Sequence, residues 1–148
     1  MDYNTFGHVL KSRGIESHLA WQDLKVLIEP LPPIGRSVLG LYYPDGDPSL
    51  GIPIGTIWIP PDADDETVLH ELGHRYGHYQ YDDLSEPFAE KFRNKYRNIH
   101  VTPRVATYSV PRISDYEYAV IREQMELNGD INYDAVIYSD IRIVSRRV

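Results

Sequence analysis

The stretch TVLHELGHRY, residues 67–76, holds the most informative pattern of the chain. In an α-helix, residues four apart lie on one face, so a helix here would present the imidazoles of His70 and His74 to a single metal ion. Glu71 follows His70 by about 100° of helical rotation, within reach of a water molecule on that metal. Zinc lowers the pKa of bound water, and a carboxylate can take the proton, so the spacing predicts a Zn²⁺ hydrolase with Glu71 as general base.

The residues around the motif fit an amphipathic helix. Leu69, Leu72 and Tyr76 recur at helical spacing roughly opposite the two histidines, which places the histidines off the core face. Acidic residues within 62–66 suit a helix start, where they complement the free N–H groups and the helix dipole. Gly77 is expected to end the helix soon after the motif. The alternative interpretation is a surface helix with two solvated histidines.

A third metal ligand is expected from the segment SEPFAEKF, residues 85–92. Ser85 or Glu86 can cap a helix there, and Pro87 fits its first turn. Glu86 and Glu90 are four residues apart and share a face, so one carboxylate could bind zinc while the other holds a ligand histidine by its free ring N–H. The alternative is a pair of solvated glutamates that form ion pairs with basic residues of the same helix, Arg93 and Arg97.

The motif HExxH followed by ExxA and an acidic residue resembles the signature of the gluzincin metallopeptidases. The resemblance covers about residues 54–97 and is closest to the minimal, single-domain intracellular peptidases of the IrrE–ImmA type. It implies that Glu86 is the third zinc ligand, that Glu90 is the acid that supports a ligand, and that the substrate is a protein or peptide. It also implies a zincin-like fold: a small twisted sheet, an active-site helix and a glutamate helix behind it.

The chain departs from that family in one respect. Only eleven residues separate His74 from Glu86, which is short for gluzincins. A first helix that ran past Tyr79 could bring Glu90 to the metal instead, whereas an end near Gly77 favours Glu86.

A second zincin pattern fits less well. Residues 70–77 match the beginning of the metzincin signature, but that signature needs a histidine three residues after Gly77, where this chain has Gln80. His78 comes too early for that role. It follows His70 by eight residues, about 80° further round the helix, so it either neighbours the site or, as we expect, is an exposed histidine at the helix end.

Composition limits the classes of protein to consider. The 148 residues suit one domain, 1–148, and 42% hydrophobic with 25% charged residues is ordinary for a globular protein. The net charge of −7 argues against a nucleic-acid partner, and the absence of cysteine excludes a thiolate zinc site. No stretch has the apolar core of a signal peptide or the length to span a membrane, so we expect a cytoplasmic or virus-associated protein.

The remaining patterns predict an α+β fold. Residues 54–59 form either a sheet-edge strand that pairs with an extended peptide substrate, as the resemblance implies, or a core strand. Ser114 and Glu117 form a capping box. The other predicted elements are helices at 2–12 and 114–128, a turn at 44–48, and strands at 24–29, 38–43 and 135–144.

The sequence thus predicts a minimal zincin-like zinc metallopeptidase. An electrophilic partner for the tetrahedral intermediate is also needed, and the candidates are Tyr76, His78, His100, Tyr108 and Tyr116. The competing interpretation is a zincin-fold structural or binding module, for example a virus-particle or assembly component, with little or no turnover.

Overall fold

The computed structural model describes residues 1–31, 38–102, 111–128 and 135–138. The described elements combine helices with one mixed sheet, which confirms the predicted α+β class. In chain order they are α1 (Tyr3–Ser12), the 3₁₀ turn η1 (Leu19–Trp21), β1 (Val26–Ile28), β2 (Leu41–Tyr43), β3 (Thr56–Ile59), α2 (Asp65–Tyr81), α3 (Glu86–Tyr96), α4 (Asp115–Asn128) and β4 (Ile137–Tyr138).

The sheet has the strand order β1-β3-β2-β4. Strand β3 pairs in parallel with β1 and antiparallel with β2, so that Trp58 lies between Leu27 and Leu41. The backbone groups of β3 are therefore used on both sides. Of the two predicted alternatives for residues 54–59, the core strand is confirmed and the substrate-pairing edge is wrong. The outer strands among the described residues are β1 and β4.

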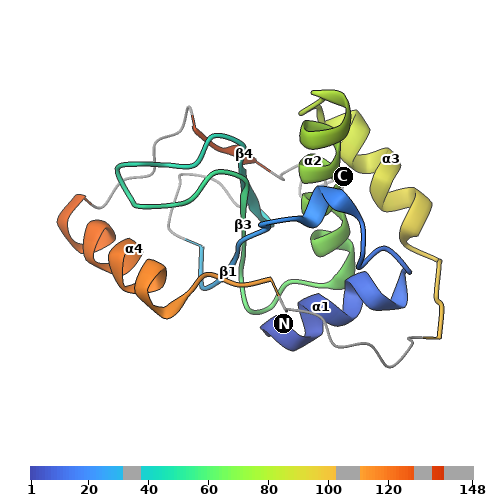
Figure 1. The fold of residues 1–148 in the computed structure, drawn as a ribbon, viewed down its shortest axis with the longest axis horizontal. Coiled ribbons are helices and arrows are strands. Elements are labelled where there is room, and N and C mark those ends of the chain that lie inside the picture. The colour runs from blue at the N-terminus through green and yellow to red at the C-terminus, as the bar shows by residue number, and fades with distance from the viewer. Residues whose placement is uncertain (32–37, 103–110, 129–134, 139–148) are drawn as a thin grey trace.

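Side chains alternate across the sheet and create a core on each face. Ile57 and Ile59 of β3 join the core beneath α1, α2 and α3, whereas Trp58 joins the core covered by α4. Figure 1 shows the sheet between these two groups, with α4 on one side and the other helices on the opposite side. This arrangement sets the HExxH helix against one face of the sheet.

Local sequence signals place the helix starts as predicted. The side chain of Asp64 accepts a hydrogen bond from Thr67 N–H at the start of α2, and Ser85 does the same for Phe88 N–H at the start of α3. The Ser114–Glu117 capping box is formed in both directions, at 3.1 and 3.2 Å. The predicted strand 135–144 contains β4, and its residues beyond 138 lie outside the described part of the chain.

The predicted end of α2 at Gly77 is wrong, because the helix continues to Tyr81. It stops where Asp82 adopts a left-handed conformation, with φ 50° and ψ 40°, and the N–H of Asp83 bonds to the Gly77 carbonyl at 2.9 Å. A methyl group at Gly77 would lie 2.3 Å from the Asp83 carbonyl oxygen. Gly77 therefore makes room for the returning chain rather than ending the helix.

None of the helices among the described residues combines the length and apolar composition needed to cross a bilayer.

Candidate metal centre

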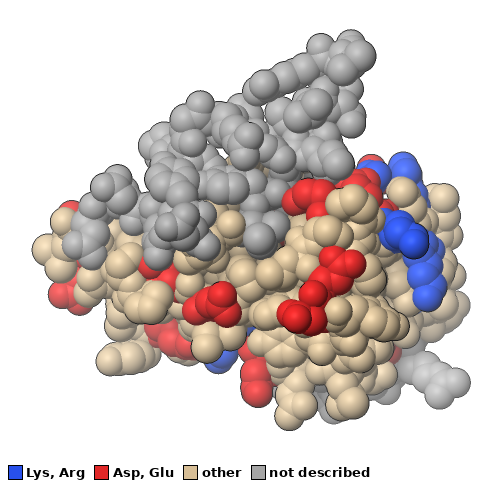
Figure 2. All heavy atoms as spheres, turned by 90° about the horizontal axis from the view of Figure 1, so that it is seen from above, with Lys and Arg blue, Asp and Glu red and all other residues tan. Residues whose placement is uncertain are grey.

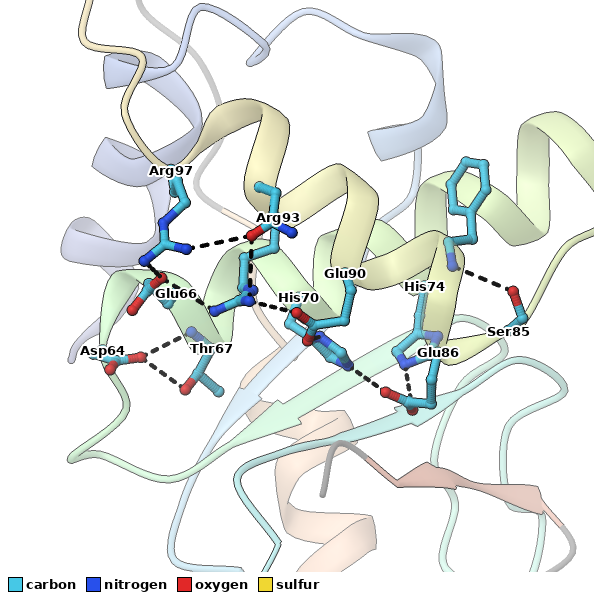
Figure 3. A network of polar contacts seen from close by, with 12 residues as sticks. Asp64, Glu66, Thr67, His70, His74, Ser85, Glu86, Glu90, Arg93 and Arg97 are labelled. Atoms are coloured by element: carbon cyan, nitrogen blue, oxygen red, sulfur yellow. Dashed lines mark hydrogen bonds and ion pairs between the residues drawn. The ribbon is translucent and has the colours of Figure 1, made fainter. Parts of the chain in front are cut away.

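Helices α2 and α3 pack antiparallel and bring His70, His74 and Glu86 together (Figure 3). Nε2 of His70 lies 2.8 Å from one Glu86 oxygen, and Nε2 of His74 lies 2.9 Å from the other. One ligand atom from each residue can be chosen so that all lie within 4.8 Å of one another. In a tetrahedral zinc site with bonds of about 2.0–2.1 Å, donor atoms lie roughly 3.3 Å apart, so this donor set fits the ion with small adjustments.

The motif is buried, although its histidines lie off the apolar face of α2 as predicted. His70 is 1% exposed, and Glu71 and His74 are 0% exposed. The reason is that α2 is covered on opposite sides: its apolar residues face the sheet, while α3 covers the histidines. The interpretation of residues 70–74 as a solvated helix surface is therefore wrong.

Glu86 is held as an anion. Burial disfavours its charged form, but hydrogen bonds and positive charge from His70 and His74 outweigh burial and lower the pKa of Glu86 to about 2. A carboxylate that stays ionised at neutral pH is what a metal ligand requires.

Glu90 supports the opposite edge of the His70 ring. Its Oε1 lies 2.8 Å from Nδ1 of His70, so this ring lies between two carboxylates. A neutral imidazole carries one N–H and cannot donate to both carboxylates, whereas a protonated ring donates to both. If Nε2 binds a cation, the proton on Nδ1 donates to Glu90 and both nitrogens are satisfied, as in carboxylate–histidine–zinc arrangements. This chemistry also fits a metal at the site.

The predicted alternative, in which the glutamates pair with arginines, describes Glu90 only in part. Glu90 contacts Arg93 through its second oxygen while it also contacts His70. Arg93 and Arg97 both reach Glu66 of α2, at 3.2 and 2.9 Å. Figure 3 shows the resulting chain of charged groups from the surface to His70.

Close packing of the two helices allows the short carboxylate side chain of Glu86 to reach the histidines. A methyl group at Gly73 would lie 2.9 Å from both Cα and the carbonyl oxygen of Ala89 in α3. The sequence argument linked a helix that runs past Tyr79 with Glu90 as the carboxylate at the metal. That link does not hold, because α2 continues to Tyr81 and Glu86 still contacts Nε2 of both histidines. The four residues 82–85 reverse the chain direction between α2 and α3, which leaves Glu86 in the first turn of α3 close to the histidines.

Glu71, the predicted base, lies against the segment that enters β2. A methyl group at Gly40 would be 3.0 Å from the carboxylate oxygen Oε1 of Glu71. The glycine thus leaves room for the buried carboxylate. Nothing in the local sequence around Gly40 indicated this contact, because it joins segments far apart in the chain.

Of the candidate electrophilic partners, Tyr76, Tyr116 and His100 do not gather at the centre. Tyr76 packs among Phe88 and Phe92, Tyr116 is 80% exposed on α4, and Tyr108 lies outside the described residues. His100 is exposed, with its Nδ1 3.5 Å from Nη1 of Arg13.

The structure adds Tyr42, which the sequence argument missed. Its ring is nearly parallel to that of His74, with centroids 6.3 Å apart, and its hydroxyl lies 2.8 Å from Nδ1 of His78. His78 is therefore half-buried rather than exposed, and burial lowers its pKa. The strand alternation of Leu41–Tyr43 was the one signal that could have placed Tyr42 on the helix-facing side.

Scans against protein-family models, curated proteins and solved structures found no match to this chain.

The two glutamates are separable by mutation. We expect Glu86→Gln to weaken zinc binding more than Glu90→Gln, for which a loss of about 10–100-fold is typical of a supporting carboxylate. Competition with a zinc-sensitive chelator dye measures both affinities. Glu66→Gln is the matched control, because it removes a carboxylate from Arg93 and Arg97 without touching either histidine. A larger loss from Glu90→Gln would reverse the assignment of the two roles.

Proposed function

We propose that this protein is a zinc-dependent metallopeptidase with a minimal, gluzincin-like zincin architecture, acting on proteins or peptides. His70, His74 and Glu86 would hold the zinc, and Glu71 would act as general base. The observation that carries the proposal is the convergence of two imidazole Nε2 atoms on one carboxylate, 2.8 and 2.9 Å away, next to the buried acid of the HExxH motif.

Bound zinc would supply a Lewis acid that polarises the peptide carbonyl and lowers the pKa of the attacking water. The carboxylate of Glu71 accepts a proton from that water and then passes it to the nitrogen of the leaving amine. Glu90 holds the proton on Nδ1 of His70, which keeps Nε2 free as a donor atom. Arg93 in turn fixes the carboxylate of Glu90.

A structural or binding module is the second candidate. It is favoured by the way the same contacts join α2 to α3: a metal held by His70, His74 and Glu86 would fasten the two helices together whether or not a substrate is cleaved. The two candidates agree on the metal and differ on the need for Glu71.

Metal content tests the shared part of the proposal. We expect about one zinc per chain by elemental analysis of purified protein, and a melting temperature that rises when zinc is added to metal-free protein. Zinc binding should weaken as the pH falls below about 6, because protons then compete with the metal for imidazole nitrogens. Protein that carries no metal and neither binds zinc nor gains stability from it would contradict the proposal.

A peptide-library cleavage profile tests the enzymatic part. We expect cleavage that phenanthroline abolishes and added zinc restores. No cleavage of any peptide mixture by zinc-loaded protein would leave the structural module as the better account.

A further inference from the structure

An aromatic groove lies between α2 and α3, with a volume of about 390 Å³. Ring contacts join the two helices along its floor, with Tyr76 5.2 Å from Phe92 and 6.1 Å from Phe88 between centroids. Phe92 is buried, whereas Tyr81 at the end of α2 is 64% exposed. The groove therefore offers an apolar floor and an accessible aromatic edge.

The groove is separate from the candidate metal centre. At about 100° per residue, Glu86, Glu90 and Arg93 fall on one face of α3. The groove residues Phe88, Lys91, Phe92 and Lys95 fall on the opposite face. A ligand in the groove would therefore contact the face of α3 that points away from Glu86 and Glu90, and it would not contact the metal-binding atoms of the centre.

The rim of the groove is basic although the chain carries a net charge of −7. Lys91 and Lys95 are exposed, and neither forms an ion pair within the part of the chain that the structure describes. The ammonium group of Lys95 lies 5.1 Å from the centroid of the Tyr96 ring. Figure 2 shows most of the visible Lys and Arg side chains at the right-hand end, where α3 lies in Figure 1, and Asp and Glu spread over the middle and left.

We propose that this groove is a docking site for an acidic peptide segment of a partner protein that carries an aromatic or large aliphatic side chain. The apolar side chain packs among the rings of α2 and α3, where exposed aromatic residues give large contact areas at low entropic cost. The acidic residues of the segment lie beside Lys91 and Lys95. Because the chain as a whole carries a net charge of −7, the two lysines of the rim favour binding of the acidic segment at the groove.

Fluorescence anisotropy of a labelled peptide tests this proposal. The probe has one Trp flanked by Asp and Glu, and two control peptides replace the Trp by Ala or the acidic residues by Lys. We expect the probe to bind and both control peptides to bind at least about tenfold more weakly. Its affinity should fall as the salt concentration rises, because screening weakens the contacts with the lysines.

Matched protein variants locate the binding. Lys91→Glu and Tyr81→Ala should each weaken the probe by about tenfold, since each removes an exposed groove contact without touching the core. Arg122→Glu on α4 changes the net charge as much as Lys91→Glu but lies on the other side of the sheet, and it should change the affinity by less than about twofold. Unchanged melting temperatures would show that all three variants fold.

Three results would overturn the proposal. The first is no binding of the probe at about 1 mM, where even weak peptide complexes are populated. The second is an equal loss from Lys91→Glu and Arg122→Glu, which would indicate attraction without a site. The third is a dimer in sedimentation that Lys91→Glu disrupts, which would mean that a second copy of the chain occupies the groove.

Discussion

Glu71→Gln is expected to lower peptide hydrolysis by roughly 10²–10⁴-fold while zinc content and melting temperature are kept. Glutamine has nearly the same size and helix propensity as glutamate, and it fits the space against Gly40, but it cannot accept the proton of the attacking water. The Glu71 carboxylate does not belong to the group His70, His74 and Glu86 that could hold a metal, so its loss should not weaken zinc binding. Initial rates of zinc-loaded protein on a fluorogenic peptide measure the loss.

Glu123→Gln is the matched control for this change. Glu123 is exposed on α4, and its replacement should leave the rate within about twofold. If Glu71→Gln and the parent protein cleave at the same rate, Glu71 is not the base. If neither cleaves any peptide, and only loss of His70 or His74 harms folding or assembly, the structural module is the correct account.

Arg75→Met is expected to lower the free energy of unfolding by about 3–5 kcal/mol, the largest effect on stability that we anticipate for a single change. The Arg75 side chain is 1% exposed and donates to three backbone carbonyls, from Nε to Ala20, from Nη1 to Gly55 and from Nη2 to Gln22, at 2.7–2.9 Å. Methionine fills similar space but leaves these carbonyls without their donor.

Thermal unfolding measures this effect, and a domain of this size should lose about 10 °C or more. Arg122→Met is the control, because Arg122 is exposed on α4 and should shift stability by no more than about 0.5 kcal/mol. Equal shifts for the two variants would show that the carbonyl contacts of Arg75 contribute little. Gly55 belongs to the same arrangement, since a methyl group there would lie 2.2 Å from Nη1 of Arg75.

The parts of the candidate site that the sequence predicted are those that depend on helical spacing alone. His70 and His74 share a face because they are four residues apart, and Glu86 and Glu90 do so for the same reason. Helix starts were also local, since Asp64 and Ser85 cap the residues that directly follow them. Each of these relationships is fixed within about two turns of chain.

The parts that the sequence missed depend on contacts between distant segments. The burial of the histidines comes from α3 packing over α2. The sequence left open whether β3 is an edge or a core strand, and the pairing of β1 and β2 with both its edges decides this. Gly77 was a good local candidate for the end of the helix. In the structure the backbone of Asp83 packs against it, so Gly77 is needed for space and not as a helix end. Arg75 follows the motif directly, and only its contacts with Ala20 and Gly55 distinguish it from a surface arginine.

The three candidate metal ligands His70, His74 and Glu86 come from one helical hairpin formed by α2 and α3. The loop-closure entropy for joining them is small, and contacts close in sequence form quickly, whereas the β1–β3 pair must join Val26 to Ile57. Zinc would therefore bind the α2–α3 hairpin and stabilise it before the sheet assembles. We expect stopped-flow refolding to be faster with zinc than without it, and an equal rate would mean that the hairpin docks late. In this way an ion needed for chemistry would also set the order in which the chain folds.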